Sequence, residues 1–177
     1  MLTCASSYLG HKPIWNWLTA NTALPNTKGM RQAVHKDNTF PHPRYPFYFI
    51  ANVPLCEFCV ENGATEFWLG SHAHTSSRDQ VMATKPEDVH YAGYHMGQPL
   101  PAITDEALEA RHVVRPPVQP KSSPGDVVIR DIRLWHAGKR PLTLVILDSF
   151  SYNNVHYIKV CQMRWKRIAS CLVWDTR

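Results

Sequence analysis

The stretch from Gln32 to Phe49 reads Q-A-V-H-K-D-N-T-F-P-H-P-R-Y-P-F-Y-F, and the interpretation of the whole chain depends on it. Near its start, His35 and Asp37 are separated by a single residue. In an extended strand, residues i and i+2 point to the same face, so this imidazole and this carboxylate can both approach one metal ion. An isolated His-x-Asp pair is common by chance, and a surface histidine beside a solvated aspartate is the simpler alternative.

A metal site needs a third ligand, and the best candidate is His136, far downstream in the stretch R-D-I-R-L-W-H-A-G. Two histidines and one carboxylate form the facial triad of non-haem Fe(II) oxygenases, which leaves coordination positions open for other molecules. We therefore expect His35, Asp37 and His136 to be the metal ligands and the catalytic residues. Imidazole and carboxylate alone would accept several divalent metals.

Four motifs follow one another along the chain: Gln32-x-x-His35-x-Asp37, P-F-Y-F-I-A-N-V-P-L (46–55), E-N-G-A-T-E-F-W-L-G-S-H (61–72) and G-D-V-V-I-R-D-I-R-L-W-H-A-G (125–138). Together they resemble the phytanoyl-CoA dioxygenase family, in particular its fungal members of secondary metabolism. The resemblance covers about residues 18–138 of an expected single domain, 1–177, and residues 139–177 diverge from the family.

The resemblance implies a dioxygenase that uses Fe(II), 2-oxoglutarate and O2 to oxidise a C–H bond of a small organic substrate, by hydroxylation, desaturation or cyclisation. Family positions that match Gln32 and Thr65 commonly contact 2-oxoglutarate. The usual anchor of this cosubstrate, an arginine beyond the distal histidine, is displaced or missing, and Arg140 is the candidate substitute. Lys139 is a poorer one because it lacks the planar guanidinium group. Related halogenases lack the carboxylate ligand, so Asp37 favours oxidation.

Fourteen prolines against eight glycines, with short apolar segments between turn signals, favour an all-β-dominated fold. Trp15 to Leu18 fit either a short helix or an edge strand. Strands are expected over 32–37, 47–53, 65–69, 113–118, 127–135 and 142–150, and short peripheral helices over 84–88 and 104–110, the second with Thr104 as its N-cap. The lack of βαβ alternation points to an antiparallel sandwich or jelly roll. The resemblance implies a double-stranded β-helix, which we expect to be incomplete at both ends.

The composition is that of a globular protein long enough for one core: 177 residues, 44% of them hydrophobic and 19% charged. A net charge of +5 would suit an anionic small molecule, although a solubility charge is the simpler account. The basic stretch 159–167 lacks a nucleic-acid-binding signature, and no apolar run is long enough for a membrane span. Five cysteines without a secretory signal favour reduced thiols and a cytoplasmic location. The oligomeric state stays open.

Two other functions stay open. A degenerate relative would bind metal or ligand without turnover, which the displaced arginine favours. An unrelated jelly-roll binding module would use its histidines only structurally. Phe40, Tyr45 and Trp68, near the expected entrance, favour a hydrophobic or aromatic substrate, with core packing as the alternative.

Overall fold

The computed structural model describes residues 2–10, 14–21, 32–38, 48–73, 75–82, 94–95, 98–99, 101–139 and 157–164. Its main sheet has four antiparallel strands in the order β1 (Ile14–Asn21), β10 (Tyr157–Arg164), β2 (Tyr48–Pro54) and β8 (Val128–Asp131). Three antiparallel pairs accompany it: β3 (Glu66–Phe67) with β9 (His136–Ala137), β4 (Gln80–Val81) with β7 (Ala102–Ile103), and β5 (Tyr94–His95) with β6 (Gln98–Pro99). The described helices are α1 (Leu2–Leu9), the 3-10 turn η1 (Ser77–Asp79) and α3 (Asp105–Val114).

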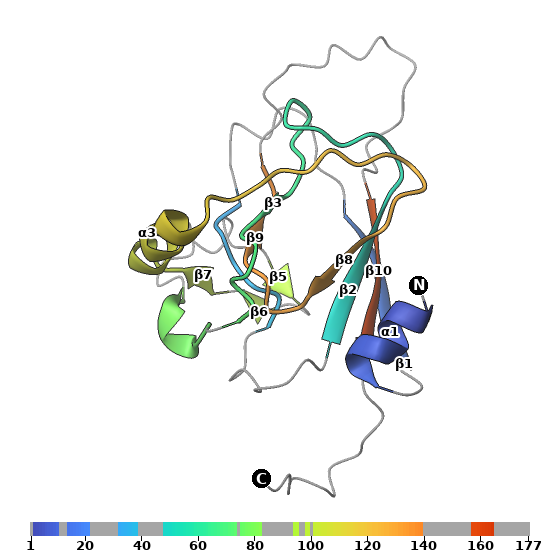
Figure 1. Ribbon diagram of the computed structural model, residues 1–177, viewed down its shortest axis with the longest axis horizontal. Coiled ribbons are helices and arrows are strands. Elements are labelled where there is room, and N and C mark those ends of the chain that lie inside the picture. Colours follow the sequence, from blue (N-terminus) through green and yellow to red (C-terminus); the bar gives the residue numbers. More distant parts are fainter. Residues whose placement is uncertain are drawn as a thin grey trace, which may run out of the picture.

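The four-stranded sheet has one face toward α1 and the other toward the rest of the fold (Figure 1). Phe49 of β2 is buried on the α1 face, where its ring lies edge-on to Tyr8 with the ring centroids 6.5 Å apart. Because side chains alternate along a strand, Ile50 and Asn52 point to the opposite face. In the β2–β8 register Ile50 pairs with Arg130, so this arginine also points inward.

A second layer faces this inner side and consists of the extended segment 32–38 together with β3 and β9 (Figure 1). A hydrophobic core covered by α3 lies on its outer side. The buried residues of this core are Val34, Trp68, Trp135, Ala137 and Ile103 of β7, and Ala107 and Leu108 of α3 pack on it. Alternation then turns His35 and His136, the neighbours of Val34 and Ala137, toward the four-stranded sheet. This packing against α3 therefore orients the two histidines.

Several expected elements are confirmed. The strand expected over 47–53 is β2, and the stretch around Trp15 belongs to an edge strand, β1. Thr104 caps α3, since its Oγ1 accepts a hydrogen bond from the backbone N–H of Ala107 at 3.3 Å. No helix in the described part of the chain is long and apolar enough to cross a membrane.

Other expectations need correction. The strand expected over 113–118 is wrong, because the capped helix α3 continues to Val114 and ends before Pro116, which disfavours helical geometry in the residue before it. The strand expected over 127–135 breaks after Asp131, whose side chain accepts a hydrogen bond from the backbone N–H of Arg133 at 2.8 Å. The segment 32–37 is extended but forms no named strand; it has only two isolated bridges, from His35 to Ala102 and to His136. The ranges 84–88 and 142–150 lie outside the described residues.

Candidate metal centre

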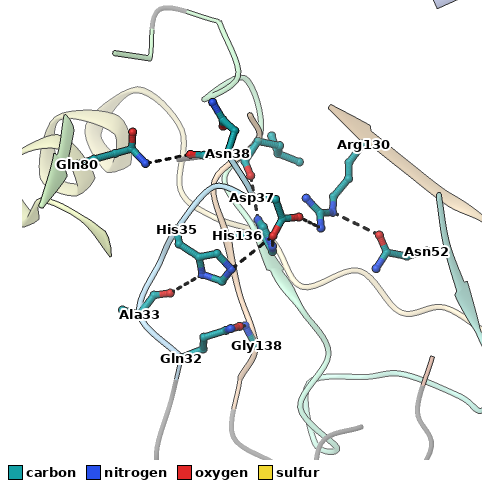
Figure 2. Close-up of polar contacts among 11 residues, drawn as sticks. Gln32, Ala33, His35, Asp37, Asn38, Asn52, Gln80, Arg130, His136 and Gly138 are labelled. Carbon is teal, nitrogen blue, oxygen red and sulfur yellow. Dashed lines mark hydrogen bonds and ion pairs between the residues drawn. The ribbon is translucent and has the colours of Figure 1, made fainter. Parts of the chain in front are cut away.

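The three predicted ligands converge on one point between the two layers (Figure 2). His35 and His136 lie directly opposite each other, because each backbone N–H donates to the other residue's carbonyl, at 3.0 and 2.9 Å. Asp37 is held two residues further on, where its N–H donates to the carbonyl of Ile132 at 3.1 Å. One ligand atom from each residue lies within 4.8 Å of the other two, and all three residues are buried.

Both imidazoles are fixed by backbone carbonyls. Nδ1 of His35 lies 2.9 Å from the carbonyl oxygen of Ala33, and Nδ1 of His136 lies 2.9 Å from that of Leu134. A carbonyl oxygen can only accept, so each Nδ1 carries a hydrogen, and this contact turns Nε2 of each ring toward Asp37. This is the arrangement by which proteins orient metal-binding histidines.

The two Nε2 atoms point at a single oxygen of the carboxylate. Asp37 Oδ1 lies 3.8 Å from Nε2 of His35 and 3.6 Å from Nε2 of His136. The centroids of the two imidazole rings are 4.4 Å apart. Two imidazole nitrogens and one carboxylate oxygen gathered in a buried place form a set of ligands that could hold a divalent cation. Two imidazoles and one carboxylate on adjacent extended segments fit the facial iron triad.

Arg130 is the part of this centre that the sequence did not reveal. Its Nη2 donates to Asp37 Oδ2 at 2.6 Å, and both side chains are only 3% exposed. Its Nε donates to Asn52 Oδ1 on β2 at 3.3 Å (Figure 2). The available signal was the alternation along 128–136, which places Arg130 and His136 on one face of the expected strand. A charged residue among aliphatic neighbours on a core-facing side is unusual unless it has a partner.

Lys36, between the two ligands His35 and Asp37, points away from them and anchors the opposite side of the segment 32–38. Its buried side chain reaches Thr75 Oγ1 at 3.4 Å and the carbonyl of Ser76 at 3.3 Å. Burial lowers the pKa of this ammonium group, while the nearby Asp79 carboxylate partly opposes the shift. Side chains on both sides of the segment therefore hold His35 and Asp37 in place.

Gln32 and Thr65, two of the three residues predicted to contact 2-oxoglutarate, line different cavities. Gln32 accepts a hydrogen bond at Oε1 from the backbone N–H of Gly138 at 3.0 Å and lines a cavity of about 420 Å³ beside β7 and the start of α3. Thr65 lines a different, smaller cavity of about 30 Å³ together with Asn52. Arg140 lies outside the described residues.

Lys139 and Trp68 each have a defined structural partner in Glu66. The ammonium group of Lys139 forms an ion pair with Glu66 Oε2, and Nε1 of Trp68 donates to Glu66 Oε1 at 2.9 Å. Trp68 also belongs to the core under α3, so its reading as part of a substrate entrance is wrong. Phe40 and Tyr45 lie outside the described residues.

Comparison with known proteins agrees with this geometry. The family described as Phytanoyl-CoA dioxygenase (PhyH) matches residues 3–144, which is more than half of the chain. The chain belongs to the phytanoyl-CoA dioxygenase family. This family uses Fe(II) and 2-oxoglutarate, and the triad of His35, Asp37 and His136 fits its iron site.

Two solved structures share the fold of this family member. The crystal structure of EctD from S. alaskensis in its apoform has a TM-score of 0.58 at 17% identity, covering 90% of this chain and 47% of that protein. The crystal structure of EvdMO1 has a TM-score of 0.56 at 16% identity, covering 92% of this chain and 30% of that protein. The chain thus spans less than half the length of either structure.

Proposed function

We propose that this phytanoyl-CoA dioxygenase family member is an Fe(II)- and 2-oxoglutarate-dependent dioxygenase that oxidises a C–H bond of a small organic substrate. The observation that carries the proposal is the convergence of Nε2 of His35, Nε2 of His136 and Oδ1 of Asp37 in a buried place. The proposed reactions are hydroxylation, desaturation or cyclisation, in secondary metabolism of the fungal type. The substrate, O2 and 2-oxoglutarate are the proposed partners.

In this proposal each residue has a defined task. His35, Asp37 and His136 would hold the iron from one side, and their burial keeps bulk water away. Bound iron would supply the redox chemistry with O2 and 2-oxoglutarate. The family resemblance assigns Gln32 and Thr65, which line different cavities, as candidate neutral contacts of 2-oxoglutarate, and Arg140 as the candidate positive charge.

The architecture supports placing the site inside a double-stranded β-helix. Two layers of antiparallel strands face each other (Figure 1), and the triad lies between them, where Asp37 contacts Arg130 of β8 (Figure 2). The likeness to EctD and EvdMO1 supports the same arrangement. We propose one domain over residues 1–177, with a β-helix that is incomplete at its ends relative to the family.

Release of succinate tests the proposal. Purified protein would be incubated with Fe(II), 2-oxoglutarate and O2, with and without a panel of small hydrophobic substrates, and succinate would be measured by mass spectrometry. The proposal predicts succinate only when all three components are present, and none from His35→Ala. His112→Ala is the matched control, because His112 is exposed on α3 and remote from the triad in the chain. Equal succinate from wild type and His35→Ala would contradict the proposal.

One observation favours a second candidate, a relative that binds metal without turnover. Lys139, one of the two cations that directly follow β9, is engaged by the buried Glu66 and so is not placed to receive a cosubstrate carboxylate. Metal affinity comparable to that of active relatives, with no succinate from any substrate tested, would favour this candidate. Restoration of succinate release in the Glu66→Gln variant would show that Lys139 can take the missing role.

A further inference from the structure

The two oxygens of Asp37 lie in different surroundings. Oδ1 lies 3.8 and 3.6 Å from the Nε2 atoms of the two histidines, whereas Oδ2 accepts a hydrogen bond from Arg130 Nη2 at 2.6 Å. An arginine–carboxylate contact this short is a strong, directional, charge-assisted hydrogen bond. It fixes the rotation of the carboxylate group, and this rotation decides which oxygen faces the metal position.

Arg130 is itself held in place. It projects from β8, and its Nε donates to Asn52 Oδ1 on the neighbouring strand β2 at 3.3 Å. The side chains of Asn52 and Arg130 are diagonal neighbours on one face of the sheet, which lets such pairs interact. The four-stranded sheet therefore fixes the guanidinium, and the guanidinium fixes Asp37, which belongs to the other layer (Figure 2).

Stability is a poor explanation for this ion pair. Removing two charges from water is costly, and an apolar pair of similar volume is often as stable or more so. Arg130 Nη1 is buried and has no hydrogen-bond partner among the described residues, which adds a further desolvation cost. A pair with these costs is better explained by what it does to Asp37.

We propose that Arg130 is a positioning residue for the metal centre: it holds Asp37 Oδ2 so that Oδ1 alone faces the two imidazoles, and Asn52 orients it. This inference rests on the proposed function, because it concerns the same three ligands. It gives Asp37 a single coordinating oxygen, which leaves more of the coordination sphere to exchangeable molecules than a bidentate carboxylate would. Loss of groups that orient metal ligands typically costs about 10–100-fold in metal affinity.

The chain contains a matched control for this test. Arg133 forms another buried ion pair, with its Nε 2.7 Å from Asp131 Oδ1, but that pair lies on the α1 side of the sheet, where Tyr8 also binds Asp131. Arg133→Met removes a buried guanidinium of the same kind from the same stretch of chain. Like Arg130→Met, it leaves a buried aspartate without its arginine, here Asp131 rather than Asp37.

The experiment titrates the full metal-free chain with Co(II), a substitute for Fe(II) that absorbs visible light. It records both the affinity for Co(II) and the ligand-field absorption spectrum. Arg130→Met is expected to bind Co(II) about 10–100-fold more weakly and with an altered spectrum. Arg130→Lys, which keeps the charge but cannot bridge Asp37 and Asn52, is expected to show an intermediate loss. Asn52→Leu is expected to show a smaller loss of affinity than Arg130→Met, and Arg133→Met is expected to match wild type in both readouts.

Several results would overturn the inference. Arg130→Met with wild-type affinity and spectrum would do so, as would an equal loss in Arg133→Met. If Arg130→Met does not fold, Arg130→Lys and Asn52→Leu provide the test. Wild-type Co(II) affinity and spectra in both of these variants would refute the positioning role. Wild-type protein that binds no Co(II) at all would instead overturn the proposed function, and the two failures are therefore distinguishable.

Discussion

Replacing Asp37 by alanine should destabilise the metal-free protein as well as abolish oxidation. The substitution leaves the Arg130 guanidinium, whose side chain is 3% exposed, without its carboxylate. Breaking a buried ion pair by removing one partner typically costs about 3–5 kcal/mol, because the remaining charge stays buried and uncompensated. We therefore expect the free energy of unfolding of Asp37→Ala to fall by about that amount. In the double variant with Arg130→Met, most of the loss should be recovered, since both charges are then absent.

The assay is urea denaturation in EDTA, repeated with Mn(II) in place of EDTA. A ligand at about 100 times its Kd stabilises the native state by about 2.7 kcal/mol, so wild type should gain roughly this amount from saturating Mn(II). Asp37→Ala should gain nothing. The control is Asp131→Ala, which also strands a buried arginine, Arg133, and should lose a similar amount in EDTA but keep its gain from Mn(II).

Two results would refute this reasoning. A loss of less than about 1 kcal/mol in metal-free Asp37→Ala would mean that the pair with Arg130 is not buried as described, because such a value is typical of exposed pairs. A full Mn(II) gain in Asp37→Ala would mean that the carboxylate is not a ligand.

Three further predictions concern other parts of the chain. Burial opposes ionisation of Asp131, but hydrogen bonds from Arg133 and Tyr8 outweigh it and lower the pKa of this carboxyl. The unfolded chain therefore binds more protons, and the stability that Asp131 contributes is present above about pH 4 and is lost as the pH falls further. Acid unfolding of Asp131→Asn should lack this component. Thr104→Ala should lower the free energy of unfolding by about 1 kcal/mol, through loss of the α3 N-cap, in urea denaturation at neutral pH. Gln32→Ala should raise the KM for 2-oxoglutarate in the succinate assay more than it changes Co(II) affinity; an unchanged KM would remove Gln32 from the cosubstrate site.

Local features of the site and fold were predictable from the sequence. The i, i+2 spacing of His35 and Asp37 sufficed to place both on one face, because an extended backbone alternates whatever its partner strand is. Thr104 followed by two acidic residues predicted the start of α3, since capping depends on neighbouring residues only. The distant partner His136 came from the ordered motifs, and the structure places its backbone directly opposite His35.

The parts that failed depend on contacts between remote segments. Strand β10 pairs with both β1 and β2, and this non-local pairing left no periodic signal in the sequence that we could use. The break after Asp131 arises from one side-chain hydrogen bond to Arg133 N–H, which competes with strand geometry. The role of Arg130 required knowing that its strand faces Asp37 across the interior. The alternation of side chains predicted the face on which Arg130 lies, but it did not identify Asp37 as its partner.

The most direct test of the whole account is an anaerobic Fe(II) titration of wild-type protein and of His136→Ala, with His112→Ala as the control. We expect wild type and His112→Ala to bind one Fe(II) per chain. His136→Ala should bind Fe(II) at least about 10-fold more weakly, because removal of a group that only orients a metal ligand already costs about that much affinity. Failure of wild type to bind Fe(II), or equal affinity in His136→Ala, would contradict the claim that His35, Asp37 and His136 form one metal site.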